Sequence, residues 1–197
     1  MKTAIIPVPT GVKGYIFDLD GTIIDSMPMH LKSYNYALEV WGIVYPKEVF
    51  QSRAGIPTLE TLEMIAEEYD VKNPDYDEVI GRIRYYEMNN SGQITMIEPI
   101  HDIIKEAYDR LPMAIGTGNN RKHVDLLVDQ FSLDQYIPHI VTATEVTNGK
   151  PHPETFLKCA ELIGIEPGDC VVFEDGVLGI QAAEAAGMQV VDVTKYL

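Results

Sequence analysis

Short apolar runs recur along the chain, and from Ile94 onward they alternate with helical patterns. The runs lack strict alternation of apolar and polar residues, as expected of strands covered on both faces of a parallel sheet. Between the runs, apolar residues recur at the spacing of a helix that packs one face on a sheet. This pattern predicts an α/β fold with a doubly wound, Rossmann-like parallel sheet. The candidate strands are Gly14-Tyr15-Ile16-Phe17, Pro112-Met113-Ala114-Ile115-Gly116, His139-Ile140-Val141-Thr142, Cys170-Val171-Val172-Phe173 and Gln189-Val190-Val191-Asp192-Val193.

Residues 26–95 interrupt this alternation, because they contain no convincing strand. Apolar residues recur there at helical spacing in three stretches, 31–41, 59–69 and 79–86, and Asn73-Pro74 separates the second from the third. We therefore predict two domains. An α/β catalytic core comprises residues 1–25 and 96–197, and an all-helical cap of residues 26–95 is inserted after the first strand.

Composition limits the partners of the chain. Its 197 residues include 15 basic and 30 acidic side chains, a formal charge of −15, so nucleic acids and anionic membranes would be repelled. Two cysteines are too few for a disulfide framework. No apolar stretch approaches the roughly 20 residues of a membrane span, and no signal peptide is evident. We expect a cytoplasmic protein, a monomer or weak homo-oligomer, that binds small molecules.

The strongest chemical signal is Asp18-Leu19-Asp20-Gly21-Thr22, at the point where the first strand ends. Asp18 and Asp20 point to the same side while the chain is extended. Two adjacent, partly desolvated carboxylates repel each other unless a cation or a shared proton lies between them, which suggests a Mg²⁺ site. A solvated turn is the simpler alternative. An EF-hand loop fits worse, because its glycine and glutamate would fall at other positions.

Three further motifs follow strands of the predicted sheet. In Gly116-Thr117-Gly118-Asn119-Asn120 a hydroxyl and the amides of Gly118 and Asn119 could hold an anion at a helix N-terminus. The other two are Lys150, in Gly149-Lys150-Pro151-His152-Pro153, and the pair Glu174-Asp175. Taken singly, each is as consistent with an ordinary turn or a solvated surface residue.

Their common position changes this interpretation. In open α/β sheets, ligands bind outside the carboxyl ends of the strands. Carboxylates, a hydroxyl with free amides and one lysine therefore converge there. A metal would neutralise phosphate oxygens, lysine would supply fixed positive charge and a carboxylate would attack in line. The predicted chemistry is phosphoryl transfer.

With these four motifs in this order, the chain resembles the haloacid dehalogenase-like phosphatase superfamily, and within it the β-phosphoglucomutase-like subgroup with a helical cap. The resemblance covers nearly the whole chain, including a helix-forming stretch from Gly179 to Met188 after the fourth motif. The Ala-x-Gly-Thr-Gly pattern from Ala114 to Gly118 is similar to that of a bacterial sugar-phosphatase branch acting on fructose-1-phosphate and 6-phosphogluconate.

The resemblance implies roles for the motif residues. Asp18 would be the nucleophile that forms an aspartyl-phosphate, and Asp20 the general acid and then the general base. Asp18, the backbone carbonyl of Asp20, and Asp175 would hold Mg²⁺, with Glu174 in contact with these ligands rather than with the metal.

The resemblance also implies how substrate would be held. Thr117, Gly118 and Lys150 would bind the phosphoryl group. Candidate contacts to the rest of the substrate are His30 at the cap entrance, Gly55 and Thr58 in the cap's specificity loop, and Asn119. An exposed helix histidine is an equally good reading of His30.

One departure bears on the reaction. In β-phosphoglucomutases a cap arginine grips a second phosphate, and Thr58 stands at the aligned position here, although Arg53 is close in sequence. We therefore expect a Mg²⁺-dependent phosphatase of small phosphorylated metabolites, with sugar phosphates favoured. A β-phosphoglucomutase-type isomerase is the alternative, and a non-catalytic phosphate-binding module is a weaker one.

Overall fold

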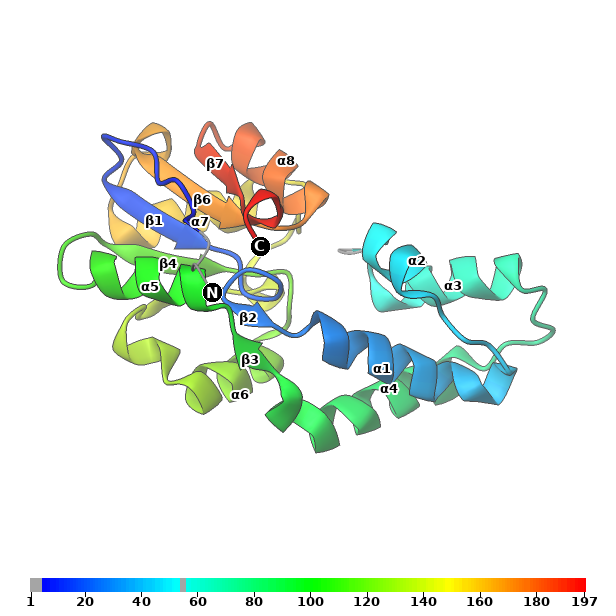
Figure 1. Ribbon diagram of the computed structural model, residues 1–197. Helices are drawn as coiled ribbons and strands as arrows, with labels where there is room; N and C mark the ends of the chain where they lie inside the picture. The colour runs from blue at the N-terminus through cyan, green and yellow to red at the C-terminus, as the bar shows by residue number, and fades with distance from the viewer. Residues whose placement is uncertain (1–4, 54–55) are drawn as a thin grey trace. The chain divides into compact units, whose positions relative to one another are not determined.

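A parallel sheet forms the centre of the α/β part of the chain (Figure 1). The computed structural model describes residues 5–53 and 56–197. The strand order is β5-β4-β1-β6-β7, and every neighbouring pair runs parallel. The predicted fold class is confirmed. The five strands are β1 (Gly14–Phe17), β4 (Met113–Gly116), β5 (His139–Val141), β6 (Cys170–Glu174) and β7 (Gln189–Asp192).

Helices cover both faces of this sheet, as right-handed crossovers between parallel strands require (Figure 1). Helices α7 (Glu154–Ile163) and α8 (Val177–Ala185) pack on one face, where Phe156 and Ala182 are completely buried with Ile16 and Val172 of the strands. Helices α5 (Glu98–Ala107) and α6 (Arg121–Phe131) lie on the other. Because both faces are covered, the strands can be apolar throughout.

Residues 26–95 form a separate helical unit. Its helices are α1 (Met27–Leu38), α2 (Lys47–Ser52), α3 (Thr58–Glu68) and α4 (Tyr76–Asn90). They enclose their own apolar core, which includes Leu38, Leu62, Ile65 and Val79. The chain divides into two compact units, Met1–Asp25 with Met96–Leu197, and Ser26–Thr95.

Some short elements were not predicted. Helix α2 has too few turns for a helical period to show in its sequence, and strands β2 (Ile24–Asp25) and β3 (Thr95–Met96) form a two-stranded sheet of their own. Strand β6 continues through Glu174, one residue past the predicted run. The 3₁₀ helices are Glu39–Trp41, Ser91–Gln93, Leu133–Gln135, Ala143–Glu145, Pro167–Asp169 and Val193–Lys195.

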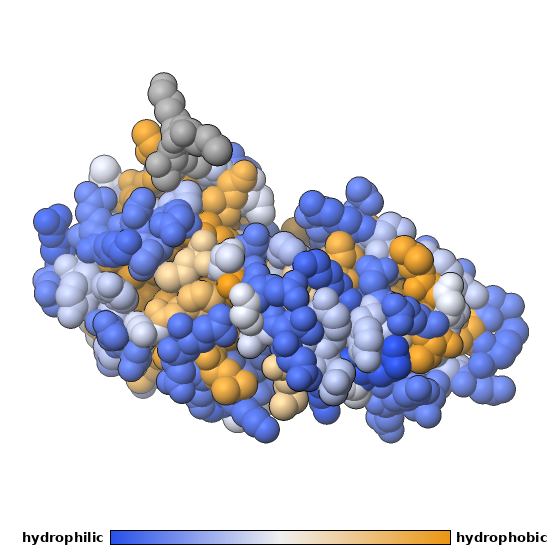
Figure 2. Space-filling view, turned by 60° about the horizontal axis from the view of Figure 1, so that its bottom comes forward, coloured by the Kyte–Doolittle hydropathy of each residue, from blue (hydrophilic) through white to orange (hydrophobic). Residues whose placement is uncertain are grey.

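The face of the molecule in Figure 2 is largely hydrophilic, and its hydrophobic side chains lie in separate clusters. The high net charge of the chain is consistent with such a surface. Within the part of the chain that the structure describes, no helix combines the length and the apolar character needed to cross a membrane.

Candidate active site

Asp18 is placed by the central strand of the sheet. It follows β1 directly, and its backbone N–H donates to the carbonyl oxygen of Phe173 at 3.0 Å. Gly21 then turns the chain with φ of +87°, and a side chain there would overlap the carboxylate of Asp175. The glycine of the first motif is therefore needed both for the turn and for the close approach of Asp175.

Lys150 brings two of the motifs together. Its Nζ lies 2.6 Å from Oδ1 of Asp18 and 2.7 Å from Oε2 of Glu174. Its side chain is only 11% exposed. Burial by itself would lower the pKa of Lys150, but the two carboxylates outweigh burial and raise this pKa above its usual value. The ammonium is thus held charged in a nearly closed site.

Glu174 is bound on both of its carboxylate oxygens. Oε2 accepts from Lys150, and Oε1 accepts from the backbone N–H groups of Asp175 at 3.1 Å and Gly176 at 2.9 Å. The side chain of Glu174 also lies against the backbone of Gly179, where any Cβ would overlap it. Glu174 therefore fixes both Lys150 and the turn that carries Asp175.

Asp18, Glu174 and Asp175 form a cluster whose carboxylate oxygens lie within 4.8 Å of one another. Desolvation raises the pKa of Asp18 well above its usual range, with the Glu174 charge adding to it. Desolvation and the charge of Glu174 likewise raise the pKa of Asp175 to about 7. A hydrogen bond from Thr22 acts in the opposite direction but has a smaller effect on this pKa. Three carboxylates face one ammonium, so their full ionisation would leave excess negative charge that a cation could neutralise. Hard carboxylate oxygens in this arrangement fit a divalent cation such as Mg²⁺.

The second motif follows the neighbouring strand. Thr117 comes directly after β4, is 2% exposed, and its hydroxyl accepts from the N–H of Asn119 at 3.2 Å. Gly118 is exposed. The side-chain amide of Asn119 donates to Oδ2 of Asp20, so the structure joins the second motif to the first.

Of the predicted contacts in the helical unit, His30 has a partner within that unit. Nδ1 of His30 lies 2.7 Å from Oε1 of Glu87, and both side chains are about four-fifths buried, at 21% and 20% exposure. His30 is therefore not an exposed helix histidine. Thr58 is the first residue of α3 and is exposed, whereas Gly55 lies outside the described residues.

Arg53, the cation nearest to Thr58 in sequence, pairs within the helical unit. Nη2 lies 2.8 Å from Oε2 of Glu68, and Nη1 donates to the hydroxyl of Tyr45 at 3.2 Å. The guanidinium also lies over the Tyr45 ring, 5.8 Å from its centroid.

The sequence did not single out three contacts that the structure places at this site. The Thr22 hydroxyl donates to Oδ1 of Asp175 at 3.3 Å, and the ring of Phe156 lies 4.7 Å from Nζ of Lys150. The third is the bond from Asn119 to Asp20. The "Gly-Thr" of the first motif could have pointed to Thr22. Phe156 reads only as a core residue of an amphipathic helix.

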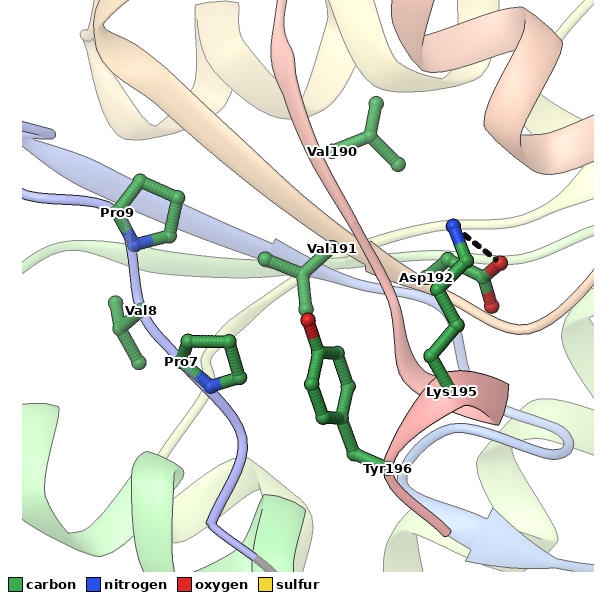
Figure 3. Close-up of a pocket in the computed structure, with 8 residues that line it drawn as sticks. All are labelled: Pro7, Val8, Pro9, Val190, Val191, Asp192, Lys195 and Tyr196. Carbon is green, nitrogen blue, oxygen red and sulfur yellow. Dashed lines mark ion pairs between the residues drawn. The ribbon is translucent and has the colours of Figure 1, made fainter.

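A cavity of about 290 Å³ elsewhere in the α/β unit holds none of the predicted site residues (Figure 3). It is lined by residues 7–9, by β7 and by the last residues of the chain, including Tyr196. Its ionic groups, Lys195 and Asp192, pair with each other at 3.1 Å. Nothing in its lining suggests chemistry.

Comparison with known proteins agrees with this architecture. The sequence profile of the family described as haloacid dehalogenase-like hydrolase matches residues 15–193. Fructose-1-phosphate phosphatase YqaB of Escherichia coli is 38% identical over 182 residues, 91% of this chain and 95% of that protein. Beta-phosphoglucomutase of Bacillus subtilis is 26% identical, covering 92% of this chain and 83% of the mutase.

A solved structure is similar over most of the chain. A haloacid dehalogenase-superfamily hydrolase of Geobacter sulfurreducens superposes with a TM-score of 0.72 at 26% identity, over 91% of this chain and 86% of that one. The fold is thus a Rossmann-like α/β fold, with the polar motifs at the carboxyl edge of its parallel sheet. The chain belongs to the haloacid dehalogenase-like hydrolases, and the prediction of an enzyme of this family is confirmed.

Proposed function

We propose that the protein is a Mg²⁺-dependent phosphatase that hydrolyses small phosphorylated metabolites, with sugar phosphates as its substrate class. The observation that carries this proposal is the Lys150 ammonium held at 2.6 Å from Asp18, at the sheet edge where Thr117 and Asp175 also lie. A buried cation beside a carboxylate offsets the repulsion between that carboxylate and a phosphate dianion.

The reaction proceeds in two displacements. An oxygen of Asp18 attacks phosphorus, the bond from phosphorus to the substrate oxygen breaks, and Asp20 protonates the leaving oxygen. Water then attacks the aspartyl-phosphate, Asp20 accepts the proton of that water, and inorganic phosphate leaves with Asp18 regenerated. Thr117, Gly118 and Lys150 hold the phosphoryl oxygens in both steps.

Asp18, Asp175 and the backbone carbonyl of Asp20 are the residues that would hold Mg²⁺. When bound, the ion supplies positive charge that neutralises phosphate oxygens. Glu174 has both oxygens engaged by Lys150 and backbone amides, so it acts by holding its neighbours in place.

The helical unit, residues 26–95, is assigned the role of a cap that selects the substrate, with His30, Thr58, Gly55 and Asn119 as candidate contacts. Its Arg53 is engaged by Glu68 and Tyr45, so a mutase-type grip on a second phosphate would first have to break these contacts. This favours hydrolysis over isomerisation. The similarity to both a sugar phosphatase and a β-phosphoglucomutase keeps the isomerase as the second candidate.

The test is release of inorganic phosphate from a panel of phosphorylated sugars, sugar acids and nucleotides with Mg²⁺. We expect a sugar phosphate to give the highest kcat/KM and Asp18→Asn to lower kcat by several orders of magnitude. Asp102→Asn, on the exposed face of α5, is the matched control and should retain full activity. Comparable activity of Asp18→Asn and the wild type would refute the nucleophile.

The isomerase is tested in the same preparation with β-glucose-1-phosphate and a bisphosphate primer. We expect inorganic phosphate to form faster than glucose-6-phosphate. If glucose-6-phosphate formed faster than inorganic phosphate, the proposed phosphatase function would be wrong and the isomerase function would take its place.

A further inference from the structure

The aromatic ring of Phe156 lies beside the ammonium of Lys150. Nζ is 4.7 Å from the ring centroid, within the distance at which a cation is attracted to an aromatic face. Phe156 belongs to the first turns of α7 and is completely buried. The contact is therefore shielded from water, which strengthens it.

The ring complements the other partners of Lys150. An ammonium has three N–H donors, and Asp18 and Glu174 each accept a hydrogen bond from it. The face of Phe156 attracts the charge without competing as a hydrogen-bond acceptor. It can therefore hold the ammonium while leaving a donor for a phosphoryl oxygen.

The same ring also contacts the second motif. A methyl group placed on Gly116 would lie 3.0 Å from Cδ1 and 3.1 Å from Cε1 of Phe156, so the ring packs directly on this backbone. Gly116 ends β4 and immediately precedes Thr117. One buried side chain thus supports both the lysine and the turn that are assigned to phosphoryl binding.

We propose that Phe156 is a positioning residue for phosphate binding, whose aromatic face fixes the Lys150 ammonium relative to Thr117. This inference rests on the proposed function and extends it to a residue outside the four motifs. A residue that only fills the core would act through its volume, whereas a positioning residue of this kind acts through the negative charge of its face.

Fluorinated phenylalanines separate the two roles, because fluorine withdraws charge from the face with little change in ring shape. We would incorporate 4-fluoro-, 3,5-difluoro- and 3,4,5-trifluorophenylalanine at position 156 and measure binding of inorganic phosphate by calorimetry in the presence of Mg²⁺. The dissociation constant should rise stepwise along the series, by roughly 2- to 30-fold in total. KM for p-nitrophenyl phosphate should rise together with this dissociation constant, while kcat changes less. The reason is that the contact between the positioned Lys150 ammonium and the phosphoryl group is weakened in the bound substrate and in the transition state alike.

The matched control is the same series at Phe131, a partly buried residue at the end of α6, which should leave both constants unchanged. An active wild-type enzyme whose phosphate affinity stays constant across the Phe156 series would overturn the positioning role alone. A wild-type protein that neither hydrolyses phosphate esters nor binds inorganic phosphate would overturn the proposed function, and the role of Phe156 with it.

Discussion

Replacing Gly179 by alanine tests whether Glu174 must occupy its observed place. Gly179 lies in the first turn of α8, and a Cβ there would overlap the Glu174 carboxylate. Glu174 is 3% exposed and has little room to move. The carboxylate would be displaced from Lys150 or from the backbone amides of Asp175 and Gly176.

The expected change in the free energy of unfolding is the balance of one stabilising and two destabilising contributions. Alanine in a helix interior gains about 0.5–1 kcal/mol over glycine. Overpacking costs about 1–3 kcal/mol, and each hydrogen bond lost from a charged group costs about 1.5–3 kcal/mol. We expect Gly179→Ala to lower the free energy of unfolding by about 2–4 kcal/mol, or roughly 5–15 °C in Tm.

The assay is urea unfolding followed by circular dichroism, together with kcat/KM for a sugar phosphate. Gly81→Ala is the matched control, because Gly81 is also helical and a Cβ there meets nothing within 4 Å. That variant should be as stable as the wild type or slightly more so, with unchanged activity. If Gly179→Ala behaved like Gly81→Ala, the rigid placement of Glu174 would be refuted.

Three further outcomes are expected. A chelator should abolish phosphate release and Mg²⁺ should restore it, whereas full activity in EDTA would exclude the proposed metal requirement. Asp20→Asn should slow single-turnover phosphorylation by sugar phosphates more than by p-nitrophenyl phosphate, whose leaving group needs little protonation; equal losses would remove Asp20 from the acid role. Burial would raise the pKa of Glu145, but hydrogen bonds from Arg121 and Thr142 lower it to about 2. Ionised Glu145 therefore stabilises the folded protein above about pH 4.5, and this stabilisation is lost as the pH falls toward about 2. The difference in free energy of unfolding between wild type and Glu145→Gln, measured by chemical denaturation, should narrow over that range.

The sheet could be predicted from sequence because its strands are covered on both faces, which leaves uninterrupted apolar runs such as Cys170-Val171-Val172-Phe173. The helical unit could be predicted for a different reason: α1, α3 and α4 are long enough for apolar residues to recur visibly at helical spacing. Helix α2 and the β2–β3 pair are too short to leave such a signal.

Only the part of the site that directly follows the strands could be predicted from the sequence. Asp18, Thr117 and Glu174 could be brought together because parallel strands share one carboxyl edge. The pairing of Lys150 with both carboxylates depends on the path of a loop, and the ring of Phe156 depends on the rotation of α7. Such features are set by tertiary packing, which no local pattern encodes.

The position of β1 in the sheet also governs the order in which the chain can assemble during synthesis. Strand β1 is made first, yet its two neighbours are β4, which begins at Met113, and β6, which begins at Cys170. The helical unit has all its core residues between Ser26 and Thr95, so its contacts are short in sequence and can form early. Asp18 therefore reaches its partners only after most of the chain has left the ribosome, and a nascent chain that ends before β4 leaves the apolar β1 without either of its neighbouring strands.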